Sequence, residues 1–330
     1  MDLLWNLYHA DCPEFLRKAA DTPPMRRLRD IGMNCGCEYT HFPRFLDLGP
    51  YSRYDHSLGT ALIIWHFTES REQALAGLFH DVTAPVFAHV VDFLKGDHLQ
   101  QEATEAGVEP YLAASPEVMA LLDNEGITLA DVSDYHRYPL ADKAVPALSA
   151  DRLEYTFGNL LNYGFADLGT IRAMYRDLTV VRDETGTPEL AFRTPELAAA
   201  FAAGALKNSR VYVADEDRFA MQAMAELLRL ALALGTITEG ALWTTESAVI
   251  AALEQDPVCG PLWHRFCGFS GLLRSAERQT SGTWLQVNAK KRYIDPLAAG
   301  MGRVSSWNAE FRRELEAFHR LDFSCWMQGQ

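Results

Sequence analysis

The chain has 330 residues, and 48% of them are hydrophobic, which is enough to build a sizeable buried core. It carries 44 acidic and 30 basic residues, so its formal net charge is −14. Because nucleic acids are bound by basic surfaces, this balance argues against a long nucleic-acid partner and leaves room for a small phosphorylated molecule in a local basic pocket.

The sequence also indicates the cellular environment. Its first residues, MDLLWNLYHADCPEF, lack the basic start of a signal peptide, and no apolar run is long enough to cross a membrane. The six cysteines form neither zinc-type CxxC pairs nor a disulfide framework, so reduced thiols are expected. We therefore expect a cytoplasmic protein without a membrane partner.

The N-terminal segment is predicted to be helical and then irregular. Residues 1–35 have amphipathic helical spacing that breaks at two prolines, and Thr22 before them is expected to cap a helix through residues 25–32. Residues 39–54 contain several Pro and Gly residues and are predicted to form a loop.

Apolar residues then recur with helical spacing from His56 to about residue 101. His56 opens the first helix of this stretch, and His80 with Asp81 closes the next one. If the two helices are antiparallel, all three polar side chains meet at the same end of a helical bundle.

The rest of the chain is predicted to contain more helices and a little β-structure. Thr128 and Ser149 are the expected N-caps of two of these helices. The expected elements are helices at 116–126, 128–135 and 149–164, a β-hairpin at 178–193, helices at 195–208, 215–234 and 245–254, a strand at 284–298 that ends at Pro296, and a last helix at 305–320.

The fold class follows from this order of elements. The chain is predicted to be mainly α, a helical bundle with a small β-hairpin or sheet and further helices in its C-terminal part. The change of character after Tyr175 favours a core of residues 1–175 with a C-terminal α+β portion of residues 176–330 packed on it, or one continuous domain.

Four polar residues in apolar surroundings form the candidate site: His56, His80, Asp81 and Asp151. Burying two imidazoles and two carboxylates is costly unless a charge compensates them, and a divalent metal ion would do so. This mixed nitrogen and oxygen set suits Fe, Mn, Co, Ni or Zn better than Ca. Such an ion lowers the pKa of bound water and polarises a phosphoryl oxygen.

The same stretches resemble the HD superfamily of metal-dependent phosphohydrolases, whose metal ligands follow the order H…HD…D. The chain is most similar to the branch that contains the deoxynucleoside triphosphate triphosphohydrolases. The resemblance covers about residues 20–165, through DTPPMRRLRDIG, YTHFPRFLDLGPYSRYDHSLGTA and SADRLEYTFGN, with a weaker echo in KKRYIDPLAAGMGRVSSWNAEF. It implies an HD-type helical bundle.

The resemblance also implies roles for individual residues. It makes the four polar residues the ligands of a divalent transition metal, Mn, Fe, Co or Ni, with Zn and Mg also compatible. Arg53, Arg152 and Tyr155 match positions that contact the phosphates and sugar of the substrate. His89 and Asp92 match a histidine–acid pair for proton transfer, and His98 matches a further active-site histidine.

The sequence departs from that branch at several positions. Ala84 stands where the family has a histidine in the middle of its HD motif, and Met33-Asn34 replaces a Gln-Leu pair that gates the deoxyribose. Asn159 replaces the acid that contacts the sugar 3′-hydroxyl. The reaction class therefore carries over, and the triphosphohydrolase substrate does not follow with it.

Two classes of function remain open. The first is an enzyme that uses metal-activated water to hydrolyse a phosphate ester or anhydride of a nucleotide, such as a triphosphate, a monophosphate or a related phosphorylated metabolite. The second is a catalytically impaired nucleotide or metabolite sensor on the same scaffold, which the alanine at position 84 motivates. A helical scaffold with incidental histidines ranks last. Residues 176–330 either wall the pocket or form the interface of a homo-oligomer.

Overall fold

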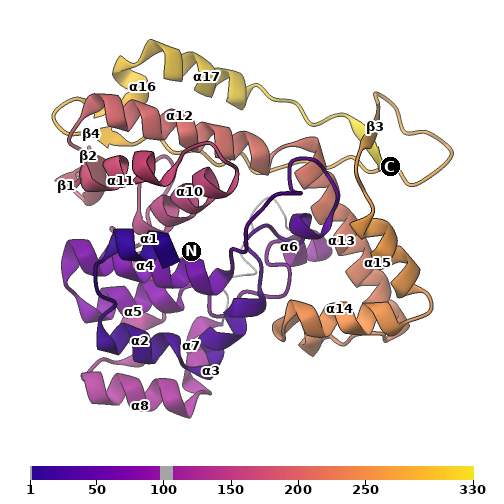
Figure 1. Ribbon diagram of the computed structural model, residues 1–330, viewed down its shortest axis with the longest axis horizontal. Helices are drawn as coiled ribbons and strands as arrows, with labels where there is room; N and C mark the ends of the chain where they lie inside the picture. Colours follow the sequence, from indigo (N-terminus) through magenta and orange to yellow (C-terminus); the bar gives the residue numbers. More distant parts are fainter. Residues whose placement is uncertain (1, 97–106) are drawn as a thin grey trace.

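The computed structural model describes residues 2–96 and 107–330 (Figure 1). Helices α1 to α17 account for most of these residues, and the β-structure is limited to a four-stranded and a two-stranded sheet. The mainly α fold is therefore confirmed. In Figure 1 the N-terminal helices form the lower left of the molecule, α12, α16 and α17 lie above them, and α13 to α15 lie to the right.

The first helices are shorter than predicted. Helices α1 (Asp2–Tyr8), α2 (Glu14–Ala20) and α3 (Pro23–Arg27) are followed by a 3₁₀ turn at Leu28–Asp30. The expected helix through residues 25–32 is therefore wrong in its second half. Thr22 does occupy the N-cap position of α3, but its hydroxyl donates backwards to the carbonyl of Ala19.

Helices α4 (Arg53–Thr68) and α5 (Arg71–Phe79) form the antiparallel pair that the histidine positions predicted. Ser52 caps α4 in a reciprocal capping box with Asp55, which satisfies backbone N–H groups at the helix start. The two helices approach closely at Gly77, where an added Cβ would lie 2.2 Å from Cδ1 of Ile64. This packing fixes the start of α4 beside the end of α5.

The helical spacing predicted from His56 to about residue 101 is interrupted after α5, and residues 97–101 of that stretch lie outside the described residues. Residues 80–83 and 86–89 form turns, and Phe87 and Ala88 have φ values of 56° and 46°. Left-handed backbone of this kind cannot belong to an α-helix. A short helix, α6 (Val90–Lys95), follows.

The next helices confirm the predicted caps. Thr128 caps α9 (Leu129–Val132), and the hydroxyl of Ser149 accepts from the backbone N–H of Arg152 in α10 (Ala150–Asn162). Helix α10 packs against α4 and α12. The remaining helices here are α7 (Val108–Ala113), α8 (Pro116–Glu125) and α11 (Leu168–Arg176).

The C-terminal half contains the predicted hairpin and the helices α12 to α15. Strands β1 (Leu178–Arg182) and β2 (Pro188–Phe192) pair antiparallel and belong to a sheet of order β1-β2-β4-β5. The short strands β4 and β5 are Leu297–Ala298 and Gly302–Arg303, and β3 (Leu272–Ser275) pairs with β6 (Trp326–Gly329). The helices are α12 (Pro195–Tyr212), α13 (Asp215–Leu234), α14 (Glu246–Gln255) and α15 (Cys259–Cys267).

Two predicted C-terminal elements are wrong. The expected strand at 284–298 is an extended segment with a single bridge at Leu285, and only its last two residues join a sheet. The expected last helix divides into α16 (Val304–Trp307) and α17 (Ala309–His319), because Asn308 leaves the helical conformation and its side chain caps α17.

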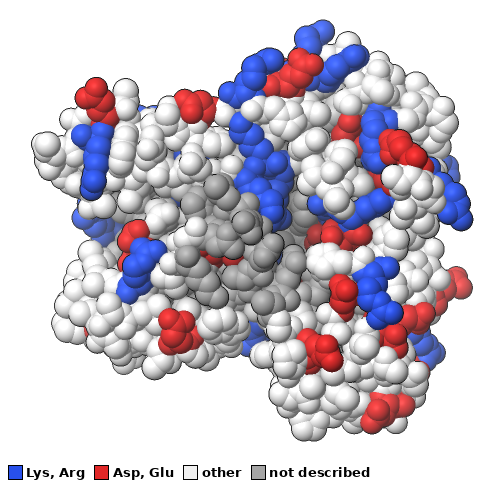
Figure 2. All heavy atoms as spheres, turned by 180° about the vertical axis from the view of Figure 1, so that it is seen from behind, with Lys and Arg blue, Asp and Glu red and all other residues white. Residues whose placement is uncertain are grey.

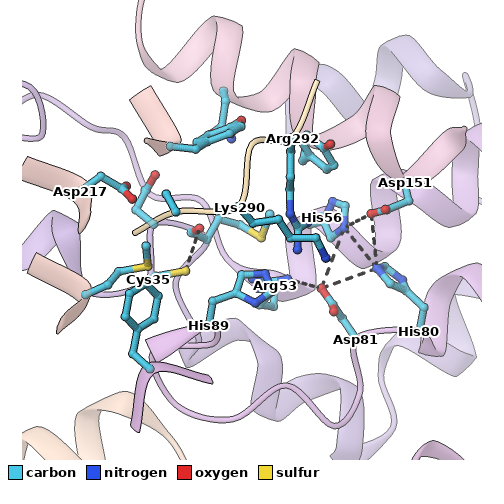
Figure 3. Close-up of a pocket in the computed structure, with 18 of the residues that line it drawn as sticks. Cys35, Arg53, His56, His80, Asp81, His89, Asp151, Asp217, Lys290 and Arg292 are labelled. Atoms are coloured by element: carbon cyan, nitrogen blue, oxygen red, sulfur yellow. Dashed lines mark hydrogen bonds and ion pairs between the residues drawn. The ribbon is translucent and has the colours of Figure 1, made fainter. Parts of the chain in front are cut away.

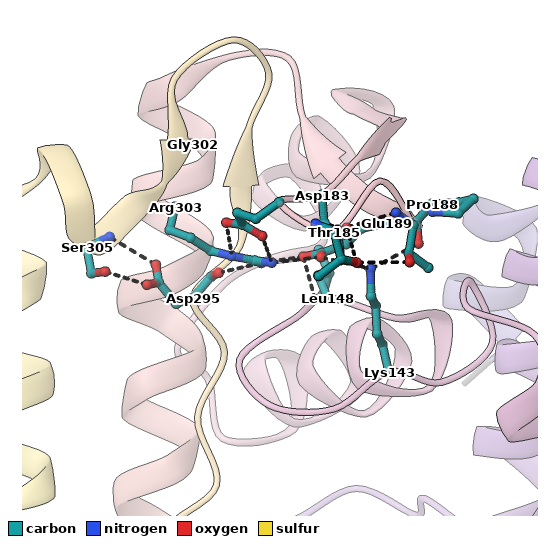
Figure 4. A network of polar contacts seen from close by, with 12 residues as sticks. Lys143, Leu148, Asp183, Thr185, Pro188, Glu189, Asp295, Gly302, Arg303 and Ser305 are labelled. Carbon is teal, nitrogen blue, oxygen red and sulfur yellow. Dashed lines mark hydrogen bonds and ion pairs between the residues drawn. The ribbon is translucent and has the colours of Figure 1, made fainter.

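A buried ionic network connects the extended segment before β4 to the β1–β2 hairpin (Figure 4). Glu189 of β2 is fully buried, and its carboxylate receives Arg303 from β5 and Lys143 from the loop before α10. Asp295 accepts hydrogen bonds from the backbone N–H and the hydroxyl of Ser305. The network therefore fixes the end of the extended segment 286–296. This segment contains Lys290 and Arg292, which line the cavity described below.

Residues on both sides of the predicted boundary near 176 line one cavity, described below. The division into 1–175 and 176–330 stays a prediction. Among the helices of the described residues, none combines the length and the apolar character needed to cross a membrane. On the face shown in Figure 2, acidic and basic side chains are interspersed, and basic side chains gather at its centre.

Candidate metal centre

Three helix ends bring the predicted ligands together. His56 lies in the first turn of α4, His80 follows the last turn of α5, and Asp151 lies in the first turn of α10. The Nε2 atoms of the two histidines are 3.2 Å apart, and Asp151 Oδ1 lies 3.0 Å from the first and 3.7 Å from the second. These three side chains converge on one point (Figure 3).

Asp81 faces the same point and is held there by Arg53. Its Oδ2 lies 3.9 Å from Nε2 of His56 and 3.6 Å from Nε2 of His80. The same oxygen accepts from Nη1 of Arg53 at 2.7 Å, and both side chains are buried. Burial alone would raise the pKa of the Asp81 carboxyl, but the Arg53 charge and the two imidazoles hold it well below its usual range.

The donor set fits a divalent transition metal. Two buried imidazole nitrogens that face each other at 3.2 Å have at most one proton to share, so a cation between them relieves the contact. Donors that bind one ion at right angles through bonds of about 2.1 Å lie about 3 Å apart, close to the shortest separations in this cluster. Two imidazoles and two carboxylates suit Mn, Fe, Co, Ni or Zn.

Glu154 supports this cluster and was not predicted from the sequence. Its carboxylate accepts from Nδ1 of His56 at 2.6 Å and from the hydroxyl of Tyr51 at 2.5 Å, and the side chain is 1% exposed. Such a bond fixes the ring so that Nε2 faces the ligand point. The available signal was its position three residues after Asp151, on the same face of α10.

His80 is oriented in the same way by the carbonyl of Gly77, which lies 2.7 Å from its Nδ1. Both histidines therefore present Nε2 to the ligand point and keep Nδ1 for the protein. In the metal-free protein His56 carries a proton: burial lowers its pKa, but its hydrogen bonds with Asp151 and Glu154 raise it to about 10. A metal ion must displace that proton.

The cluster lies at one end of a cavity, which several other predicted residues line. His89 faces the cavity, and its Nδ1 lies 3.0 Å from Oδ2 of the fully buried Asp92. Tyr155 and Asn159 also line it. The structure does not bring Arg152 to the cavity lining; its Nε lies 3.9 Å from Oδ1 of Asp142. His98 lies outside the described residues.

Two further basic residues of the cavity come from the C-terminal half. Lys290 and Arg292 line it from the extended segment before β4 (Figure 3). Lys291 between them points the other way, and its Nζ donates to the carbonyls of His319 and Leu321. Side chains alternate in extended backbone, so the sequence KKR delivers two cations to one side. Nothing in the sequence placed this segment beside α4.

The opposite end of the cavity has a different character. Asp217, from the first turn of α13, lies there with Cys35 (Figure 3). The other residues that line this cavity include Met33, Asn34, Phe93, Tyr163, Tyr212 and Met221. The sequence did not predict that these residues line the cavity. It indicated only two of them, Met33 and Asn34, as the pair that replaces Gln-Leu of the resembled family.

Comparison with known proteins gives a partial match. No protein-family model matches the chain. It is 28% identical over 191 residues to "Uncharacterized protein YdhJ" of Bacillus subtilis, a segment that covers 57% of this chain and 55% of that protein. It is 26% identical over 123 residues to "Metal-dependent phosphohydrolase cns2" of Cordyceps militaris, covering 36% of this chain and 34% of that protein. The chain thus spans about half or less of these curated relatives.

A solved structure shares the fold over nearly the whole chain. It is the crystal structure, at 2.0 Å resolution, of a hypothetical protein from Aquifex aeolicus, with a TM-score of 0.62 and 16% identity. The alignment covers 96% of this chain and 92% of that one. At this identity the likeness concerns the fold alone. The weak similarity to a metal-dependent phosphohydrolase and the His56–His80–Asp151 cluster together support the HD-type superfamily, and they do not extend to its triphosphohydrolase branch.

Proposed function

We propose that this protein is a metal-dependent phosphohydrolase that acts on a small phosphorylated molecule, with a nucleotide as the expected substrate. The observation that carries the proposal is the convergence of His56, His80, Asp81 and Asp151 at one end of a cavity that three basic side chains line. Similarity to a fungal metal-dependent phosphohydrolase supports it.

The four converging residues would hold the metal ion. When bound there, a divalent ion supplies a water molecule of lowered pKa and polarises a phosphoryl oxygen. The protein's own part is to fix the ligands, which Glu154 does for one histidine and the Gly77 carbonyl for the other.

Three basic side chains suit the phosphate group. The side chain of Arg53 donates from Nη1 to Asp81 and forms no other hydrogen bond within the described residues, so its remaining N–H groups are available to an anion. Lys290 and Arg292 line the cavity between the metal ligands and its far end, as Figure 3 shows. Such a local basic surface balances phosphate charge within a protein whose overall net charge is −14.

His89 is placed to move a proton. The buried Asp92 pairs with its Nδ1, which leaves Nε2 for the cavity. Burial, with the charges of Arg292 and Arg53, lowers the pKa of His89 below its usual value, although the bond with Asp92 acts in the opposite direction. A neutral imidazole at pH 7 accepts a proton at Nε2 and can return it to a leaving group.

The test is a screen of phosphorylated compounds with the Mn-loaded protein. Nucleoside triphosphates, monophosphates and cyclic phosphodiesters are incubated separately, and released phosphate, pyrophosphate or triphosphate is measured. Activity that requires the metal and disappears in Asp151→Ala is expected, because that change removes a ligand. Metal-loaded protein that releases nothing from any of these compounds would contradict the proposal.

The alternative is a sensor that binds a nucleotide or metabolite without hydrolysing it. Ala84 favours it, because this fully buried alanine stands where the resembled family has a histidine. The backbone carbonyl of Ala84 instead accepts from Nη2 of Arg27. In the same screen, tight binding of a compound without turnover would identify the sensor.

A further inference from the structure

The cavity has a second end that faces away from the metal ligands. Figure 3 shows Asp217 there, with Lys290 and His89 between it and the cluster around Asp151. Asp217 comes from the first turn of α13 and is only 8% exposed. The proposed phosphate chemistry uses no group at this end.

Asp217 lacks the partner that a buried carboxyl group requires. Within the described residues its one hydrogen bond comes from the thiol of Cys37, whose Sγ lies 3.7 Å from Oδ1. A thiol is a weak donor. The neighbouring cation, Arg218, pairs with Asp215 instead. Burial raises the pKa of Asp217 to about 8. Leaving such a group unsatisfied is costly, so a ligand that satisfies it gains affinity.

Other polar groups at this end also have unused hydrogen-bonding capacity. Asn159 is 5% exposed, and its Nδ2 donates to the hydroxyl of Tyr212 at 2.7 Å, while its Oδ1 has no partner within the described residues. The hydroxyl of Tyr163 already donates to Oδ1 of Asn34. Oδ1 of Asn159 and the carboxyl group of Asp217 can therefore each accept a hydrogen bond from a ligand that brings N–H groups.

The walls at this end suit a planar ring. The thioethers of Met33 and Met221 and the rings of Phe93 and Tyr163 line the cavity beside the polar groups. Methionine and aromatic side chains make favourable contacts with flat, polarisable ligands. An apolar wall with a few polar groups is the usual form of a small-molecule site.

We propose that Asp217 is a specificity-determining residue that binds an amino group on a planar ring, at the end of the substrate opposite its phosphate. The inference rests on the proposed function and adds the class of the organic part. An ionised carboxylate accepts two adjacent N–H groups, and a protonated one accepts an amino N–H while donating to the neighbouring ring nitrogen. Either state of Asp217 thus matches an amino-substituted heterocycle.

The experiment measures binding to the Mn-loaded full chain by calorimetry. The probes are guanosine against inosine monophosphate, adenosine against purine riboside monophosphate, and cytidine against uridine monophosphate. In each pair only the first compound carries a ring amino group. We expect at least one amino compound to bind roughly tenfold or more tightly than its partner, the size of a hydrogen bond to a charged or buried group.

Three variants test whether Asp217 causes the preference for the amino compounds. Asp217→Leu should abolish it, Asp217→Asn should reduce it, and Glu216→Gln should leave it intact, because Glu216 shares the same helical turn but pairs with Arg274. Metal content and circular dichroism show whether each variant is folded. If Asp217→Leu does not fold, the result for Asp217→Asn is the test. A parent protein that separates no pair, or that binds none of the probes, overturns the inference, as does a preference that survives the changes at Asp217.

The two proposals fail differently. Phosphate release tests the proposed function, and the binding preference tests Asp217. A protein that prefers the amino compounds and hydrolyses nothing would refute the phosphohydrolase and keep the recognition site. A protein that hydrolyses phosphate esters without any such preference would do the reverse.

Discussion

Replacing Glu154 by alanine tests how the protein holds its metal ligands. The carboxylate is almost completely buried and receives two short hydrogen bonds, from Nδ1 of His56 at 2.6 Å and from the hydroxyl of Tyr51 at 2.5 Å. Glu154→Ala leaves both donors buried without an acceptor. At about 1–3 kcal/mol for each donor, the free energy of unfolding should fall by about 2–6 kcal/mol.

The effect on the metal should be separate and measurable. Without Glu154 the ring of His56 is free to turn, and loss of such a supporting group typically lowers metal affinity about 10–100-fold. Titration of the metal-free protein with Mn measures this. Glu154→Gln, which keeps one acceptor oxygen, should lie between the parent and the alanine variant.

The control is a buried glutamate that forms no hydrogen bond or ion pair with the four metal ligands. Glu189→Ala removes a fully buried carboxylate from the Arg303–Lys143 network, so it should lower stability while the folded protein keeps its Mn affinity. Equal Mn affinity in Glu154→Ala and the parent would refute the role given to Glu154. An equal loss in both alanine variants would show that the metal only reports overall stability.

Three further outcomes are expected. Gly59→Ala would place a Cβ 2.6 Å from Oε1 of Glu154, so it should cost about 1–3 kcal/mol in urea unfolding and weaken Mn binding; unchanged values for both would contradict the packing described. Lys290→Ala should lower kcat/KM for phosphorylated substrates with metal content unchanged, whereas Lys291→Ala, which faces away, should not; equal effects in the two variants would remove Lys290 from the phosphate site. Because the pKa of Asp217 is raised from 3.8 to about 8 in the folded protein, its contribution to stability is complete below pH 4 and is lost as pH rises towards 8. Asp217→Asn should therefore gain stability relative to the parent between pH 5 and about 8 and no more above it, and a constant difference in urea unfolding over that range would be inconsistent with the raised pKa.

The sequence was most informative where chemistry and local structure are read from neighbouring residues. The N-caps Thr128 and Ser149 and the hairpin at 178–193 follow from side chains that act within a few positions. It was least informative at the C-terminal end. The strand expected at 284–298 has alternating side chains, but a strand also needs a hydrogen-bonding neighbour, and only residues 297–298 find one in a sheet.

The site shows the same limit. His56, His80 and Asp81 could be placed together because antiparallel helices bring a helix start beside a helix end. Asp151 was added because it lies in the first turn of a helix capped by Ser149 and matches the last ligand in the order of the resembled family. The helical spacing from His56 to about residue 101 did not reveal the interruption after α5, because apolar spacing does not report the left-handed residues after position 86. Those turns place His89 at the cavity.

By itself the sequence determined that the protein is mainly helical and that two histidines and two carboxylates occupy the ends of apolar helices. Both depend on short-range periodicity and on residue type. Only the tertiary structure decided that Glu154 holds His56, that Lys290 faces the cavity while Lys291 turns away, and that Asp217 stands at its far end. These relations join segments that are distant in the sequence through packing and a buried ionic network, about which a linear pattern carries no information.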